Sequence, residues 1–132
     1  MKTLKVFTDG ASKGNPGPAA IGAVVIDGNK EIEISEPIGV ATNNVAEYRA
    51  AIRALEIAIK LKADAIELYS DSELLIRQLK GIYKVKDSKL LKLYQRIQNL
   101  LGQFKDYTIT HIPRQMNSRA DSLARKALMG DE

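Results

Sequence analysis

The feature that most constrains the fold is a change in the spacing of apolar residues partway along the chain. The segments 2–8, 20–26 and 31–34 have the β-branched or alternating pattern of strands, and 27–29 reads Asp-Gly-Asn, a hairpin turn signal between the last two. After Thr42, apolar residues recur every three or four positions, which is typical of helices. The sequence therefore predicts three antiparallel strands followed by helices that connect further strands.

The rest of the chain predicts alternating helices and strands. Thr42, Asn43 and Asn44 offer caps for a helix that begins near them. The segments that follow predict a strand at 65–70, a helix at 72–80, a helix after Asp87 with apolar residues as far as Phe104, a strand at 107–112 and a helix at 118–129. The resulting fold class is α/β, or more closely α+β: a mixed sheet of about five strands with helices on both faces.

Length and composition predict a single domain spanning residues 1–132 and exclude several kinds of chemistry. The chain has no cysteine, which excludes disulfides, thiolate metal sites and a cysteine nucleophile, and its one histidine, His111, excludes a histidine metal cluster. The first residues contain no apolar segment typical of a signal peptide, and no run of 18 apolar residues occurs. We expect a cytoplasmic protein with no membrane partner and no obligate protein partner.

Charge is distributed unevenly along the chain. Residues 1–73 contain eight basic and eleven acidic residues, whereas residues 74–120 contain ten basic and two acidic residues. Such a basic region indicates either a polyanionic partner held against one face or a solvated helix surface. Charge alone leaves both interpretations open.

Four carboxylates stand where an acid is conspicuous: Asp9 at the end of the first predicted strand, Glu47 at the start of an alanine-rich helix, Asp71 after a short strand, and Asp121 in the last helix. Each has an ordinary alternative, since acids also begin turns and stabilise helix N-termini. If the four converged, their mutual repulsion would favour bound divalent cations, and hard oxygen ligands select Mg²⁺ or Mn²⁺. Convergence depends on the fold.

Four segments together resemble type 1 ribonuclease H. Residues 7–18, 42–47, 69–72 and 117–124 read FTDGASKGNPGP, TNNVAE, YSDS and NSRADSLA. They occur in the family's order and with similar spacing, so the resemblance covers almost the whole chain. It implies the ribonuclease H-like fold, and the shortened form resembles the compact, archaeal-like branch of the family.

The resemblance also implies a reaction and a cofactor. It implies cleavage of the RNA strand of an RNA–DNA hybrid by two Mg²⁺ ions, which Mn²⁺ can replace, leaving 5′-phosphate and 3′-hydroxyl ends. Asp9 matches the aspartate that bridges the two ions, Glu47 and Asp71 match the ligands of the ion at the leaving group, and Asp121 matches the ligand of the ion that holds the attacking water. Double-stranded RNA is a further candidate substrate.

The same matching implies residues that contact the substrate. Asparagines match the family's minor-groove contacts, a threonine and an asparagine match its pocket for a DNA phosphate, and small residues allow main-chain amides to approach the RNA. The alternatives are Asx-turn and N-cap roles. These residues are Asn15, Asn43 and Asn44 for the groove, Thr42 and Asn117 for the phosphate, and Gly10 and Ala11 for the RNA.

Three departures from the family pattern bear on function. The histidine-containing loop before the last helix is reduced to Pro-Arg-Gln-Met at 113–116, and the alternation around His111 predicts a strand residue, so Arg114 is the candidate for a positive charge near the metals. Glu73 stands where bacterial relatives often have a glutamine that contacts substrate. The extra basic helix of some relatives is missing, and the candidates to replace it are Lys84 and Lys86, with Lys80 and Lys89 nearby.

The sequence leaves three alternative functions. The same fold with a weakened metal site could bind hybrids without cleaving them. Other metal-dependent enzymes, such as exonucleases and strand-transfer enzymes, use the same fold, but these enzymes place their acids differently, and the TNNVAE segment disfavours them. A two-carboxylate glycosidase needs an aromatic sugar platform, and the chain has no tryptophan.

Overall fold

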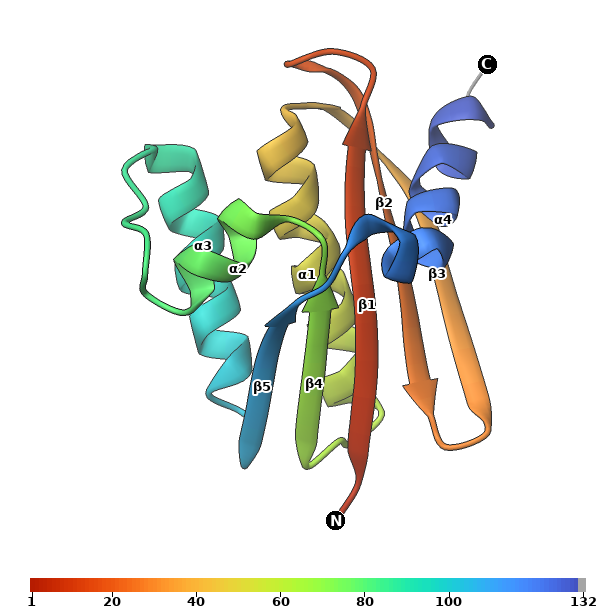
Figure 1. Ribbon diagram of the computed structural model, residues 1–132, viewed down its shortest axis with the longest axis vertical. Helices are drawn as coiled ribbons and strands as arrows, with labels where there is room; N and C mark the ends of the chain where they lie inside the picture. The colour runs from red at the N-terminus through yellow and green to blue at the C-terminus, as the bar shows by residue number, and fades with distance from the viewer. Residues whose placement is uncertain (131–132) are drawn as a thin grey trace.

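A five-stranded mixed sheet organises residues 1–130, which are the residues that the computed structural model describes (Figure 1). The strand order is β3-β2-β1-β4-β5. β1 pairs antiparallel with β2 and β2 antiparallel with β3, which confirms the three antiparallel strands predicted, and β1–β4–β5 are parallel, which makes the sheet mixed, as predicted. The strands are β1 (Thr3–Ser12), β2 (Gly17–Asp27), β3 (Lys30–Ala41), β4 (Ala65–Ser70) and β5 (Asp106–His111).

The first three strands are longer than their apolar patterns predict. β1 continues past Asp9, and its residues as far as Ser12 pair with β2. The prediction that Asp9 ends the first strand is therefore wrong. Apolar alternation stops near Asp9, but the ladder is held by main-chain hydrogen bonds, which polar residues and glycine also make.

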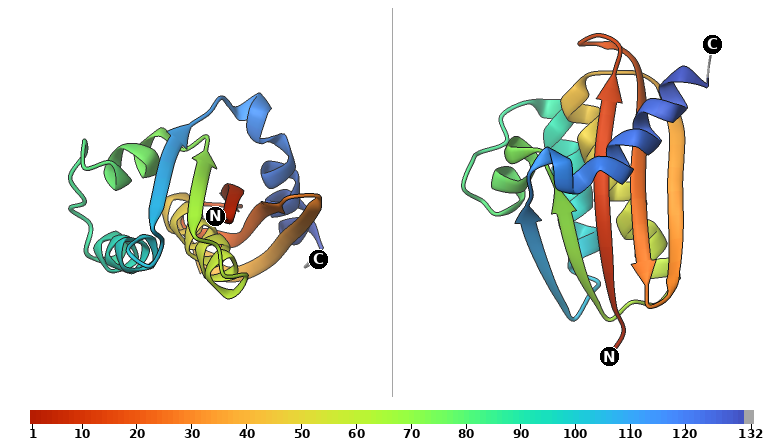
Figure 2. Two further views of the ribbon diagram at one scale, coloured as in Figure 1. Left: turned by 90° about the horizontal axis from the view of Figure 1, so that it is seen from below. Right: turned by 45° about the vertical axis from the view of Figure 1, so that its right-hand side comes forward.

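Helices cover both faces of the sheet, which confirms the predicted layers. α1 and α3 lie on one side and α4 on the other (Figure 2). The 3₁₀ helix η1 was not predicted, because the sequence indicates only a shortened loop there. The helices are α1 (Asn43–Lys60), α2 (Glu73–Leu79), α3 (Ser88–Leu101), η1 (Arg114–Asn117) and α4 (Ser118–Met129). No helix within residues 1–130 is long and apolar enough to cross a membrane.

Two glycines let helices approach the sheet closely. A Cβ on Gly10 of β1 would collide with the main chain of Ala46 and Glu47 in α1. A Cβ on Gly22 of β2 would collide with the main chain of Ala120 and of the next turn of α4. The absence of side chains at these two positions therefore sets the places of the helices that carry Glu47 and Asp121.

Candidate active site

The four conspicuous carboxylates converge on one pocket. Asp9 lies inside β1, Glu47 near the start of α1, Asp71 just after β4, and Asp121 in the first turn of α4. All four line a pocket of about 320 Å³ at the end of the sheet where α1 and α4 begin. The fold thus brings together residues whose convergence the spacing in the sequence left open.

Burial and mutual repulsion raise the pKa of two of these carboxyls. Burial, together with the negative charges of Asp71, Glu47 and Asp121, raises the pKa of Asp9 to about 8. Burial raises the pKa of Glu47 to about 7, and the charge of Asp71 adds to it, against hydrogen bonds from Ser72 and Asn43 that lower it. Positive charge in the pocket would relieve this cost.

Two arginines supply some of that positive charge. Arg114 Nε lies 3.5 Å from Asp71 Oδ2, and Arg125 Nε lies 3.2 Å from Asp121 Oδ2. Both arginines line the pocket and are largely exposed. Arg114 was predicted from the sequence and Arg125 was not, although the position of Arg125 four residues after Asp121 on a helix indicates the pair.

The donor set fits divalent cations. Glu47 Oε2 is buried and has no hydrogen-bond partner within residues 1–130, so it is free to bind an ion. Four carboxylates supply only hard oxygen ligands, which suit Mg²⁺ and Mn²⁺. Among residues 1–130 no group of three or more acidic or histidine side chains is placed to hold an ion in this conformation. Arg114 and Arg125 engage Asp71 and Asp121, so these arginines have to move before the carboxylates can bind ions.

Several of the predicted substrate-binding residues lie at the edge of this pocket. Asn15 Oδ1 accepts a hydrogen bond from the main-chain N–H of Asn43 at 3.1 Å, and Asn43 Nδ2 donates to Glu47 Oε1 at 3.1 Å. Thr42 caps α1 by accepting from the Val45 N–H at 3.2 Å, so its alternative N-cap role is present. Gly10, Ala11 and Asn43 line the pocket itself, and Asn44 is exposed beside them at the start of α1.

The structure does not support a direct substrate contact for Asn117. Its side chain is 1% exposed and donates hydrogen bonds to Thr8 O and Asp71 Oδ1. In this conformation the side chain is not open to a phosphate on the surface, and the phosphate pocket formed by Asn117 with Thr42 stays a prediction. The sequence pattern locates the residue but not the direction of its side chain.

The remaining candidates lie outside the carboxylate pocket. Lys84 and Lys86 are in the segment between α2 and α3, at the β5 side of the molecule (Figure 1). His111 lies in a strand, as predicted, where it is the last residue of β5 and is exposed. Glu73 forms an ion pair with Arg77 at 2.8 Å.

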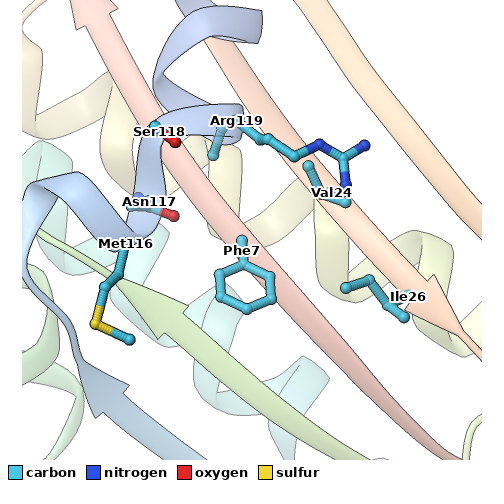
Figure 3. Close-up of a pocket in the computed structure, with 8 residues that line it drawn as sticks. Phe7, Val24, Ile26, Met116, Asn117, Ser118 and Arg119 are labelled. Atoms are coloured by element: carbon cyan, nitrogen blue, oxygen red, sulfur yellow. The ribbon is translucent and has the colours of Figure 1, made fainter.

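A second hollow, of about 270 Å³, lies on the open face of the sheet beside α4 (Figure 3). Phe7 from β1, Val24 and Ile26 from β2, and Met116 are the large apolar residues that line it. None of the four carboxylates lines it, so its apolar character does not bear on the chemistry of the carboxylate pocket.

Known proteins share both the sequence and the fold. The family model described as reverse transcriptase-like matches residues 7–127. Ribonuclease HI of Halobacterium salinarum is 49% identical over 127 residues, which are 95% of this chain and 64% of that protein. The bifunctional protein Rv2228c of Mycobacterium tuberculosis is 46% identical over 97% of this chain but only 36% of its own length. The chain thus spans between about a third and two thirds of these relatives.

Solved structures agree with these matches. The crystal structure of RNase H1 from Halobacterium salinarum has a TM-score of 0.91 at 45% identity and covers 97% of this chain and 98% of that chain. The structure of LC11-RNase H1, solved in complex with an RNA/DNA hybrid, has a TM-score of 0.89 at 40% identity and covers 97% and 98%. With its mixed sheet, its carboxylate pocket and these relatives, the chain belongs to the type 1 ribonuclease H family.

Proposed function

We propose that this protein is a metal-dependent endoribonuclease that hydrolyses the RNA strand of RNA–DNA hybrids. The observation that carries the proposal is the convergence of Asp9, Glu47, Asp71 and Asp121 on one open pocket. The complex of LC11-RNase H1 with an RNA/DNA hybrid supports the choice of substrate, because that protein is 40% identical over nearly its whole solved chain. Cleavage of a labelled hybrid in Mg²⁺ is the direct test.

The four carboxylates are the residues that would hold two divalent ions. When bound, such ions lower the pKa of the attacking water and neutralise the charge that develops on the departing oxygen. The carboxylates orient these ions, and Asn43 holds Glu47 in place through its 3.1 Å hydrogen bond. The expected products carry 5′-phosphate and 3′-hydroxyl ends. A cytoplasmic location and cleavage of double-stranded RNA stay predictions.

The alternative is a hybrid-binding module with a weakened metal site. All four carboxylates are retained and face one pocket. We therefore favour the enzyme over the binding module.

Arg114 is expected to assist turnover more than binding. Its guanidinium lies 3.5 Å from Asp71 Oδ2 and is largely exposed, so it can face a scissile or leaving phosphate at the mouth of the pocket. The Arg114→Ala variant should lose about tenfold in kcat, a loss below the 10²–10³ range of buried charge-stabilising donors because Arg114 is exposed. The KM for the hybrid should change little. Steady-state kinetics of Arg114→Ala beside Arg114→Lys check this, and an unchanged kcat in the alanine variant would contradict it.

Hybrid affinity is expected to depend steeply on salt, because lysines outside the pocket contact phosphates. Lys84→Ala and Lys86→Ala should each weaken binding and reduce the slope of log K against log salt by about 1. Fluorescence anisotropy across a salt series in EDTA measures both quantities.

The matched control removes a lysine at the opposite end of the sheet. Lys30 lies at the β2–β3 turn, away from the ends of the strands that lead into the pocket (Figure 1). Lys30→Ala makes the same charge change and should leave the slope unaltered. Equal effects of all three substitutions would show that the segment between α2 and α3 is not a phosphate-binding surface.

A further inference from the structure

Asn117 is the buried side chain that connects the elements carrying three of the four carboxylates. It belongs to the segment that leads into α4 and lies beside β1 in the view of the neighbouring hollow (Figure 3). Its Nδ2 donates a hydrogen bond to the main-chain oxygen of Thr8 at 2.9 Å and another to Asp71 Oδ1 at 3.1 Å. One amide nitrogen therefore links the start of α4 to β1 and to the end of β4.

We propose that Asn117 is a positioning residue of the ribonuclease site, which fixes Asp71 and does not touch the substrate. This inference rests on the proposed function, because it concerns the same pocket. The amide donates both of its N–H groups, and an aspartate or alanine at this position would donate neither. Asparagine can therefore bind the Thr8 carbonyl and the Asp71 carboxylate at the same time.

The two oxygens of Asp71 have different surroundings. Oδ1 is bound by Asn117, whereas Oδ2 lies 3.5 Å from the exposed Arg114. With Oδ1 held on the buried side, Oδ2 is the oxygen that remains available to a cation in the pocket. Partners that hold a metal-binding carboxylate in this way typically change metal affinity or activity by about 10–100-fold when they are removed.

The position of Asn117 in the chain extends its influence beyond Asp71. Its acceptor Thr8 immediately precedes Asp9 in β1. Asn117 itself lies four residues before Asp121, which is about one turn of helix. Loss of the amide therefore loosens the placement of Asp9, Asp71 and Asp121 relative to one another.

The alternative to a positioning role is that Asn117 only ties α4 to the sheet and has no specific effect on Asp71. Ser35 provides a comparison, because its Oγ donates to the main-chain oxygen of Leu123 in α4 at 2.6 Å and ties that helix to β3. Ser35 does not line the carboxylate pocket. Ser35→Ala therefore removes one α4 tether without removing a contact to a carboxylate, and serves as the matched control for Asn117→Ala.

The test compares the wild type with Asn117→Ala, the isosteric Asn117→Asp, and Ser35→Ala. Each protein is melted in EDTA and in a Mn²⁺ titration, and kcat and KM are measured on an RNA–DNA hybrid in Mg²⁺. We expect both Asn117 variants to fold, to lose at least about tenfold in kcat at nearly unchanged KM, and to need about tenfold more Mn²⁺ for half of the wild-type thermal stabilisation. Ser35→Ala should keep wild-type kcat and Mn²⁺ response.

Three results would overturn the inference. The first is an Asn117→Ala variant with the same kcat and Mn²⁺ response as Ser35→Ala. The second is an Asn117→Ala variant with a higher KM at unchanged kcat. The third is failure of both Asn117 variants to fold, because a positioning role requires a folded protein with an impaired site. A wild type that neither cleaves the hybrid nor gains stability with Mn²⁺ would instead overturn the proposed function. The wild-type measurements therefore separate the two failures.

Discussion

Replacing Asp9 by asparagine is expected to lower the rate of hybrid cleavage by at least about 10³-fold, because loss of several kcal/mol of metal-borne charge stabilisation has an effect of that size. Asp9 lies inside β1, is only 6% exposed and faces the charges of the other three carboxylates, so it has the most central position of the four. Single-turnover cleavage of a labelled hybrid in Mg²⁺ measures the loss.

The same variant should fold at least as stably as the wild type in EDTA. The pKa of Asp9 is raised to about 8 in the folded state, whereas in the unfolded chain it has its ordinary, lower value. Between these two values the unfolded state releases the proton and the folded state keeps it, so this carboxyl destabilises the fold increasingly as pH rises. Asparagine removes that cost, and thermal melting at pH 7 should show an equal or higher midpoint.

The control for Asp9→Asn is the same exchange at an exposed carboxylate. Asp106 begins β5 and accepts a hydrogen bond from the Tyr107 N–H, which an asparagine side chain can also accept. Asp106→Asn should cleave at the wild-type rate. If Asp9→Asn cleaved as fast as Asp106→Asn, the pocket would not be the site of the reaction.

Gly22→Ala is expected to have the largest effect on stability. The new Cβ would collide with the Ala120 oxygen and the Ala124 nitrogen and lie 3.0 Å from Leu123 Cβ. Main-chain atoms of a packed helix cannot move aside singly, so α4 has to shift away from β2 as a unit. We expect the free energy of unfolding to fall by about 3 kcal/mol, the upper end of the usual cost of overpacking, as measured by urea denaturation.

The shift of α4 should also impair the reaction, because this helix carries Asp121. Gly102→Ala is the matched control: the nearest atoms to its new Cβ are 3.5 Å away, an ordinary contact, and its φ of −64° suits alanine. That variant should be as stable as the wild type or more stable by up to about 1 kcal/mol. Equal stability of Gly22→Ala and Gly102→Ala would contradict the close packing of α4 on β2.

Much of the fold was predictable because strands and helices impose different periods on the sequence. The mixed sheet, its three antiparallel strands and α4 all followed from apolar spacing. Strand ends did not, as the continuation of β1 beyond Asp9 shows, because main-chain ladders do not require apolar side chains. The unpredicted 3₁₀ helix η1 lies in a stretch of four polar or flexible residues without a periodic signal.

The candidate site was predictable in its residues but not in its contacts. The motifs pointed to all four carboxylates, and the fold confirms that they line one pocket. They did not reveal that Arg125 pairs with Asp121, or that Asn117 is turned inward to Asp71. The Asn117 contact depends on side-chain direction between elements distant in sequence, which periodicity does not encode, whereas the Arg125 pair follows from the i,i+4 spacing on α4 and was overlooked.

The most direct test of the central claim is cleavage of an end-labelled RNA–DNA hybrid by the wild-type protein, with Mg²⁺ or with EDTA, beside double-stranded RNA and double-stranded DNA of the same sequence. We predict internal cuts in the RNA strand of the hybrid, in Mg²⁺ only, with 5′-phosphate and 3′-hydroxyl ends, and no cuts in DNA. The result for double-stranded RNA defines how strict the specificity is. Binding of the hybrid without cleavage, or cleavage that persists in EDTA, would contradict a metal-dependent ribonuclease built on these four carboxylates.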